Sequence, residues 1–355
     1  IEDQFRHHGL DVLFKAKPIE GVAGNGEHTH LGVALKLKNG RRINLFTPED
    51  AKKDYLSEIG YGALMGLLKN YEVINPIVTA TNDAFNRLKP GFEAPVCIVT
   101  SLGGTKEKPS RNRSVLVGVI RDINNPGALR FELRSPNPYS NTYLVLAASY
   151  QAMLDGIKLV TKAGLSCVEL EKEISKEYGD DGVYLEKYRE YRSEEDVFEK
   201  YSSEERNKLY GNAPATVWEN LRGFTDNRVK QQVLKSGDVF TDELINSFRE
   251  STLQKWKNEL RGRIIHDNIM LLKTFVKLHN EQDHSTDLDV VNWEKIVYLK
   301  TKLMKDSMTK KCIFTKIATA LDEDDYDTAS DLQKKMNQTM TEIRKLYIEY
   351  KNNIF

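Results

Sequence analysis

The 355-residue sequence is poor in cysteine and has no surplus of charge of either sign. Its three cysteines, Cys97, Cys167 and Cys312, are scattered along the chain. They are too few for a disulfide framework and too far apart for a structural zinc site. Lys plus Arg and Asp plus Glu each number 52, so the formal net charge is zero, and the overall balance does not indicate a nucleic-acid partner. Such cysteine usage is typical of a reducing compartment, and we expect a cytoplasmic protein.

Long hydrophobic runs and the common nucleotide-binding motifs are also missing. No segment approaches the roughly 20 apolar residues that span a bilayer, so we expect no membrane partner. Neither the G-x-G-x-x-G fingerprint nor the G-x-x-x-x-G-K-[ST] phosphate loop occurs. No signal peptide opens the sequence. The chain begins at Ile1 and not at methionine, so we expect it to be a fragment of a longer protein.

Proline disappears after Pro214 and glycine after Gly262, which predicts a largely helical C-terminal region. Within it, the spacing of apolar residues over Asp327–Asn352 predicts a long amphipathic helix. Near the N-terminus, Thr47-Pro-Glu-Asp50 resembles a capped first turn and predicts a helix over Ala51–Lys69.

One stretch, Leu129–Pro138, organises the rest of the chain. Apolar and charged residues alternate in it, with Leu129, Phe131 and Leu133 set against Arg130, Glu132 and Arg134. A period of two predicts a strand with one apolar and one charged face. The strand leads into the apolar run Tyr143–Leu154, which predicts a buried helix. A carboxylate between two guanidiniums suits a metal ion and the phosphate oxygens that it bridges; the alternative is a surface strand with a row of salt bridges.

A glycine-rich loop precedes two histidines. Gly21, Gly24 and Gly26 lie within six residues, and glycine lets backbone N–H groups approach an anion closely. His28 and His30 follow on one face of a predicted strand that runs to a hairpin turn, Lys38-Asn-Gly-Arg41. The alternative is a simple turn with structural histidines.

Two further segments carry charged candidates. Arg111–Ile120 predicts a strand with a basic start, and antiparallel pairing with the organising strand would bring Arg111 and Arg113 toward Arg134. This arrangement would collect basic side chains around Glu132 and favours a cavity. The proline-containing loop before Pro95 presents Glu93, a carboxylate that could equally be solvated at a loop tip.

Together these motifs resemble the catalytic domain of type I and type II glutamine synthetases. The similar segments follow the family order: Lys17-Pro18 with Gly24–His30, Asn86-Arg-Leu88 with Pro90–Pro95, Arg111-Asn-Arg-Ser114, and Arg130–Pro136 with Asn141-Thr-Tyr-Leu144; a weaker match is Gly237–Glu243.

The resemblance implies an α+β fold, a largely antiparallel curved sheet with flanking helices as in guanido kinases, followed by a mostly helical C-terminal region. It assigns residues 1–165 to the core of an ATP- and glutamate-binding catalytic domain. Residues 166–260 would then be a charged helical insertion with the end of that domain, and 261–355 a helical extension.

The implied activity is ATP-dependent formation of glutamine from glutamate and ammonia through γ-glutamyl phosphate, with Mg²⁺ or Mn²⁺, in a homo-oligomeric ring. By position in the motifs, the resemblance implies that His28 and Glu132 bind the metal and that Arg111, Arg113 and His30 bind ATP. The implied substrate-binding residues are Gly24, Asn25, Arg87 and Arg134. The implied catalytic residues are Glu93, Arg113 and Arg134.

The sequence departs from the family at several positions. Ala23 stands where the family has a glutamate-binding asparagine, and Gly118 replaces a second phosphate-binding arginine. The insertion over Cys167–Arg222 offers no assignable adenylylated tyrosine. The family's N-terminal β-grasp domain and upstream metal-binding glutamates have no counterpart, so we expect them on a preceding part of the chain and expect the isolated 355 residues to be inactive. Two alternatives stay open: a γ-glutamyl ligase for another amine, and a non-catalytic binding or assembly module.

Overall fold

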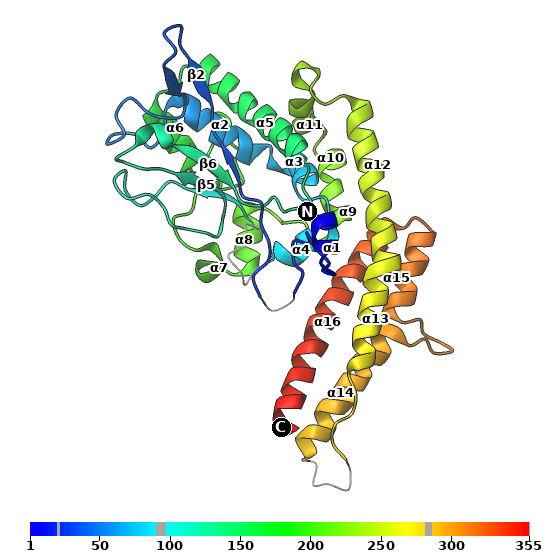
Figure 1. The fold of residues 1–355 in the computed structure, drawn as a ribbon. Helices are drawn as coiled ribbons and strands as arrows, with labels where there is room; N and C mark the ends of the chain where they lie inside the picture. The colour runs from blue at the N-terminus through cyan, green and yellow to red at the C-terminus, as the bar shows by residue number, and fades with distance from the viewer. Residues whose placement is uncertain (20–21, 90–96, 281–285, 355) are drawn as a thin grey trace. The chain divides into compact units, whose positions relative to one another are not determined.

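The computed structural model describes residues 1–19, 22–89, 97–280 and 286–354. The chain divides into two compact units, Ile1–Phe248 and Arg249–Phe355 (Figure 1). Unit 1 combines a small sheet with many helices, whereas the described part of unit 2 is helical. Over the described ranges, no helix has both the length and the apolar character needed to cross a membrane.

A four-stranded sheet forms the centre of unit 1. Its strands are, in spatial order, β1 (Thr29–Leu31), β6 (Arg130–Leu133), β5 (Val115–Ile120) and β4 (Cys97–Ser101). β6 pairs antiparallel with both β1 and β5, and β4 joins β5 in parallel. The organising strand is therefore paired on both sides, and its predicted antiparallel partnership with the segment after Arg113 is confirmed.

The two faces of β6 differ as the alternating pattern predicts. Phe131 and Leu133 are fully buried, and the Phe131 ring stacks on Phe46 with centroids 4.5 Å apart. Arg130 and Glu132, on the other face, are partly exposed. Burial of the aromatic and aliphatic side chains fixes the register, because a shift by one residue would turn the charged side chains into the core.

The remaining elements of unit 1 are mostly short helices. They are α1 (Glu2–Arg6), α2 (Glu58–Lys69), α3 (Tyr71–Val78), α4 (Asn82–Arg87), α5 (Thr142–Ala163), α6 (Cys167–Ile174), α7 (Val197–Lys200), α8 (Ser203–Tyr210), α9 (Val217–Leu221), α10 (Gly223–Asp226) and α11 (Arg228–Lys235), with α12 (Asp242–Glu259) crossing into unit 2. The helix predicted over Tyr143–Leu154 is part of α5, but it is buried on one side only, because Tyr143 and Leu154 are exposed.

The helix predicted from Ala51 begins later than expected. The Asp50 carboxylate accepts the N–H of Lys52 at 2.9 Å, so it closes a local turn and starts no helix. The actual N-cap is Ser57, whose hydroxyl accepts the N–H of Gly60 at 3.0 Å. The prediction of a helix start at the acidic, proline-containing segment was therefore wrong.

α2 and α5 pack closely because glycines face each other where the helices touch. A Cβ added to Gly66 would lie 2.2 Å from the carbonyl oxygen of Ala152, and one on Gly156 would lie 2.0 Å from that of Gly62. These contacts involve backbone atoms, which cannot move aside without separating the helices.

Replacing Gly66 with alanine is expected to lower the free energy of unfolding by about 1–3 kcal/mol, because the added methyl group overpacks this contact. Denaturant unfolding would measure the change. Gly262→Ala is the control, since nothing lies within 4 Å of that position. Equal stability of the Gly66 variant and the wild type would contradict the close approach.

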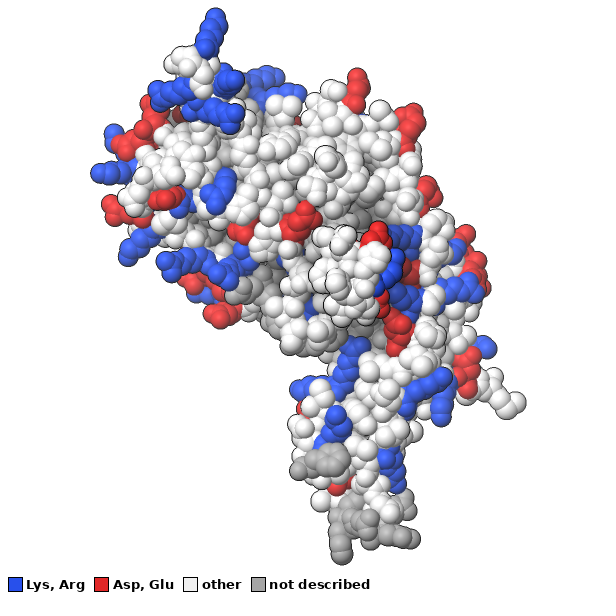
Figure 2. Space-filling view, viewed as in Figure 1, with Lys and Arg blue, Asp and Glu red and all other residues white. Residues whose placement is uncertain are grey.

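A two-stranded hairpin, β2 (Ala34–Lys36) and β3 (Arg42–Asn44), projects from unit 1. It confirms the predicted turn, but it divides the single strand expected over His28–Lys38 into β1 and β2. Lys36 lies directly opposite Arg42, and both are exposed. Figure 2 shows Lys and Arg side chains gathered over this hairpin.

The charged segment Cys167–Arg222 folds against the four-stranded sheet of unit 1. Thr100 of β4 donates its N–H to the carbonyl of Tyr191 at 2.9 Å and accepts the N–H of Ser193 at 2.9 Å. A short segment of the insertion thus pairs in parallel with the outer strand. The insertion is therefore continuous with the core of unit 1.

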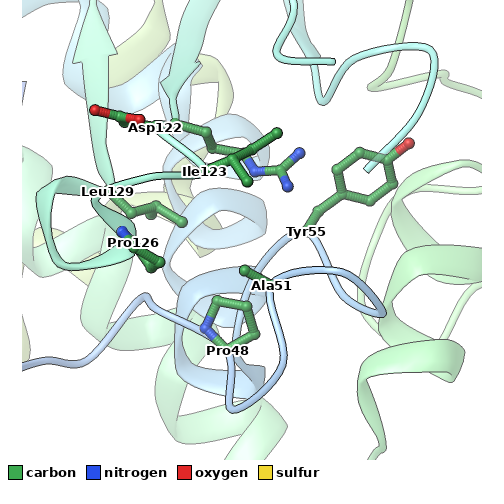
Figure 3. A pocket seen from close by; sticks show the side chains of 8 residues that line it. Pro48, Ala51, Tyr55, Asp122, Ile123, Pro126 and Leu129 are labelled. Carbon is green, nitrogen blue, oxygen red and sulfur yellow. The ribbon is translucent and has the colours of Figure 1, made fainter. Parts of the chain in front are cut away.

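A small cavity lies beside the connection between β5 and β6. Figure 3 shows Pro48, Ile123, Pro126 and Leu129 around it, with Tyr55 at its edge. Its volume is about 10 Å³, room for roughly one water molecule. This cavity is too small for a substrate.

The described part of unit 2 consists of the end of α12 and four further helices. A π-helical turn, Leu260–Ile264, leads into α13 (Ile265–Thr274), followed by α14 (Asp287–Met304), α15 (Ile313–Asp322) and α16 (Tyr326–Ile354). α16 confirms the predicted amphipathic helix, and its Met336, Met340 and Ile343 are buried. Trp256, also buried, donates its indole N–H to Gln333 at 2.8 Å.

Candidate active site

The imidazole of His28 and the carboxylate of Glu132 are in direct contact. His28 Nδ1 lies 2.7 Å from Glu132 Oε1, although the two residues are 104 positions apart in sequence. The contact arises because β1 pairs with β6 in the register that sets His30 opposite Glu132. The two side chains are 35% and 15% exposed, so both remain open to a ligand.

Glu132 is held in its charged form by its neighbours. The hydrogen bond from His28 lowers the pKa of this carboxyl and Arg134 adds to that effect, while burial opposes it. Arg134 Nη1 lies 3.5 Å from Glu132 Oε1. Gly118 lies across the strand pair, where a Cβ would come within 3.3 Å of Glu132 Oε2. The glycine that replaces the family's arginine therefore leaves room beside the carboxylate.

Arg134 is buried but keeps hydrogen-bonding capacity. Its side chain is 9% exposed, and its Nε has no hydrogen-bond partner in the part of the chain that the structure describes. A buried guanidinium N–H without a partner is costly. An anion bound beside Glu132 would be able to satisfy it.

Arg87 joins the cluster from the end of α4. It donates from Nη1 to the carbonyl of Ser135 at 3.0 Å and from Nη2 to that of Arg134 at 2.9 Å. Its Nη2 also lies 3.4 Å from His28 Nε2. Burial, with the nearby charge of Arg134, lowers the pKa of Arg87 to about 10, so the guanidinium is still charged at neutral pH.

The glycine-rich loop passes over Arg87. A Cβ on Gly24 would lie 3.1 Å from Arg87 Cγ, and one on Gly26 would lie 2.5 Å from Nη2. Asn25 anchors this loop by donating its side-chain amide to the carbonyl of Lys15 at 3.0 Å. A Cβ on Gly24 would also lie 2.4 Å from the carbonyl oxygen of Ala16, so the two glycines let the loop pass close to another backbone segment and to the Arg87 side chain. Gly21 lies outside the described residues.

His30 lies opposite Glu132 in the strand pair and contacts another arginine. Its Nδ1 accepts a hydrogen bond from Arg130 Nε at 2.7 Å. The charged face of β6 therefore carries two histidine contacts, one through Glu132 and one through Arg130.

Arg111 and Arg113 line a separate open hollow of about 770 Å³. Its described lining includes Glu194 and Asp196 but neither His28 nor Glu132. The expected gathering of basic side chains around Glu132 is thus made by Arg134 and Arg87. Glu93 falls within residues 90–96, outside the described residues.

Sequence reasoning missed Glu194. This carboxylate accepts the N–H of Leu102 at 3.2 Å and that of Gly103 at 2.8 Å, and it pairs with Arg192 at 2.7 Å. In the sequence it stands within Ser-Glu-Glu-Asp, a run that reads as a solvated surface. The backbone N–H groups that it binds lie more than 90 residues away, so no local signal marks this contact.

The donor set fits part of a divalent-metal site. An imidazole nitrogen with a carboxylate suits Mn²⁺, and Mg²⁺ is commonly held by one or two carboxylates with water and phosphate oxygens. In the described ranges, no group of three or more His, Cys, Asp or Glu side chains is arranged for a metal. His28 and Glu132 would therefore need further ligands from elsewhere.

Comparison with known proteins matches this arrangement to one family. The model of the glutamine synthetase catalytic domain matches residues 2–180, half of the 355-residue chain. The chain belongs to the glutamine synthetase family. The glutamine synthetase of Clostridium saccharobutylicum is 38% identical over 153 residues, covering 43% of this chain and 31% of that protein. For Escherichia coli K12 the values are 37% over 150 residues, 42% and 29%.

This glutamine synthetase-family chain thus spans about 30% of the length of the curated relatives that it matches. A cryo-EM structure of Plasmodium falciparum glutamine synthetase aligns with a TM-score of 0.50 and 21% identity, covering 72% of this chain and 48% of that one. The alignment confirms the predicted fold class, a small, mainly antiparallel sheet with many helices.

Proposed function

We propose that this chain is the catalytic part of an ATP-dependent ligase that forms glutamine from glutamate and ammonia. ATP would phosphorylate the γ-carboxylate, and ammonia would displace phosphate from the resulting γ-glutamyl phosphate, leaving ADP, phosphate and glutamine. The observation that carries the proposal is the contact of His28 with Glu132, flanked by Arg134 and Arg87, in a chain of this family.

In this proposal His28 and Glu132 hold Mg²⁺ or Mn²⁺. The bound cation would neutralise charge on the ATP phosphates. The direct contact of the two side chains supports the assignment, because both could reach one cation.

The arginines would bind the anionic groups. Arg134, whose Nε has no partner among the described residues, and Arg87 would hold the glutamate carboxylate and the transferring phosphoryl group in a fixed electrostatic environment. Arg111, Arg113 and His30 would contact ATP.

The remaining assignments follow the family motifs. Gly24 and Asn25 would border the glutamate site, and Glu93 would lie on a closing loop that binds ammonium and excludes water. We also propose that the full-length protein is a cytoplasmic homo-oligomeric ring, in which the neighbouring subunit supplies the missing metal ligands.

The test is phosphate release from ATP by the full-length protein with glutamate plus ammonia, ethanolamine or putrescine. We expect release with ammonia, and none from the isolated 355 residues. Release with an organic amine in preference to ammonia would identify a different γ-glutamyl ligase, which Ala23 makes worth testing. No release with any acceptor would contradict the ligase and favour a binding or assembly module.

A further inference from the structure

The loop over Ser101–Arg113 is fastened to the charged insertion by a continuous set of hydrogen bonds. At one end, the N–H groups of Leu102 and Gly103 and the hydroxyl of Ser101 all donate to the Glu194 carboxylate. Successive N–H groups that converge in this way form an anion-binding nest. Here the anion is the protein's own carboxylate.

The geometry of the loop depends on Gly103. Its φ is +105°, and a Cβ there would lie 2.3 Å from the carbonyl oxygen of Lys108. The Gly103 carbonyl is held in turn by Arg192 Nη2 at 3.2 Å and by the Tyr55 hydroxyl at 3.0 Å. The N–H and the carbonyl of Gly103 are thus both hydrogen-bonded to side chains from other parts of the chain.

The hydrogen bonds continue from Glu194 to the far end of the loop. Ser101 Oγ lies 2.6 Å from Ser110 Oγ, which accepts the N–H of Asn112 at 3.1 Å. The Asn112 side chain donates to the carbonyl of Glu195 at 2.7 Å. This series of hydrogen bonds therefore begins at Glu194 and ends at Glu195, both in the insertion, and the loop is held between its two ends.

Asn112 is the residue between the two arginines of the hollow. Its side-chain oxygen also accepts from the hydroxyl of Ser114 at 2.7 Å, and that hydroxyl accepts the N–H of Val197 in the insertion at 3.0 Å. Because Asn112 is held from both sides, the backbone that carries Arg111 and Arg113 is fixed with it.

We propose that Glu194 is a positioning residue that fixes the 101–113 loop and thereby orients Arg111 and Arg113 toward nucleotide phosphates. The inference rests on the proposed function, in which these arginines contact ATP. In this proposal the insertion supports the loop that carries the two arginines. Glu194 itself would not repel the phosphates strongly, because its charge is balanced by Arg192 and by the loop N–H groups.

The test compares Glu194→Gln with Glu195→Gln in the full-length protein, in which the proposed metal site is complete. Glutamine keeps the size of the side chain but loses its charge and turns an N–H₂ group toward the donors of the nest. Glu195 is the adjacent, exposed carboxylate, so it is the matched control. Ser101→Ala is a second variant, which removes the hydroxyl between Glu194 and Ser110 without changing charge.

Two measurements are made on each variant: amide hydrogen exchange of Leu102 and Gly103, and the Kd values of Mg·ADP and Mg·pyrophosphate. For Glu194→Gln and Ser101→Ala we expect faster exchange and Kd values raised about tenfold for both ligands, because small misplacement of binding groups is costly. Glu195→Gln should behave as the wild type.

Wild-type Kd values in the Glu194→Gln protein would overturn the inference, even if exchange is faster, because the loop would then be fastened without orienting the arginines. Unchanged exchange would overturn it as well. If the wild-type chain binds neither ligand, the assignment of Arg111 and Arg113 to phosphates fails, and the positioning role fails with it. That result is distinguishable from a defect confined to the variants.

Discussion

Mg²⁺-dependent ATP binding by the full-length protein is expected to weaken about 100-fold or more when Glu132 is replaced with alanine. Loss of a residue that only supports a metal ligand typically costs 10–100-fold, and loss of the proposed ligand itself should cost at least as much. The change would also remove the carboxylate that lies 3.5 Å from Arg134 Nη1. Metal titration of ATP binding by calorimetry would measure the effect.

Two control variants separate metal binding from folding. Glu132→Gln keeps an oxygen that can pair with His28 but removes the charge, so it should lose metal-dependent binding while keeping the fold. Glu49→Ala removes an exposed carboxylate and should change nothing. A metal titration of Glu132→Ala that matches the wild type would show that Glu132 is not a ligand.

The Arg189→Met protein is expected to lose roughly 2–4 kcal/mol of unfolding free energy, because a largely buried charge network would be broken. Arg189 Nη1 lies 2.6 Å from Glu72 Oε1, and two further nitrogens of its guanidinium donate to the carbonyl of Tyr210. Lys230 pairs with both Glu72 and Glu186. The network joins α3, the insertion and α11, so its loss should loosen all three.

Denaturant unfolding would measure this loss, with Lys187→Met as control. Lys187 pairs with Asp181 at 2.8 Å, but both side chains are exposed, and such pairs contribute at most about 1 kcal/mol. Equal losses in the two variants would contradict a special role for the Arg189 network.

The same network should make stability depend on pH. Burial alone would raise the pKa of Glu72 and of Glu186, but Arg189 and Lys230 outweigh it and hold both below the ordinary value of 4.5. The stabilisation is therefore fully present above about pH 4.5 and is lost as the pH falls through the lowered values. When the free energy of unfolding is measured by denaturant at a series of pH values, it should fall less steeply below about pH 4.5 in Arg189→Met than in the wild type.

The alternating pattern around Glu132 was sufficient to predict the strand and its buried face. Apolar burial at every second residue leaves a single workable register, so these features follow from local sequence. The amphipathic pattern of α16 predicted its helix for the same reason. The Ala51 start failed because Asp50 can close a turn as readily as it can begin a helix.

The sequence by itself determined the family motifs, the charged face of β6 and the residues that meet on it. Only the tertiary structure decided that Arg111 and Arg113 line a hollow with Glu194, and that a run of surface-like acidic residues fastens the loop between them. The physical reason is that a hydrogen bond between residues more than 90 positions apart leaves no periodic trace in either segment. Buried apolar residues recur at regular intervals along a strand or a helix, whereas a single carboxylate that binds backbone N–H groups produces no repeating pattern.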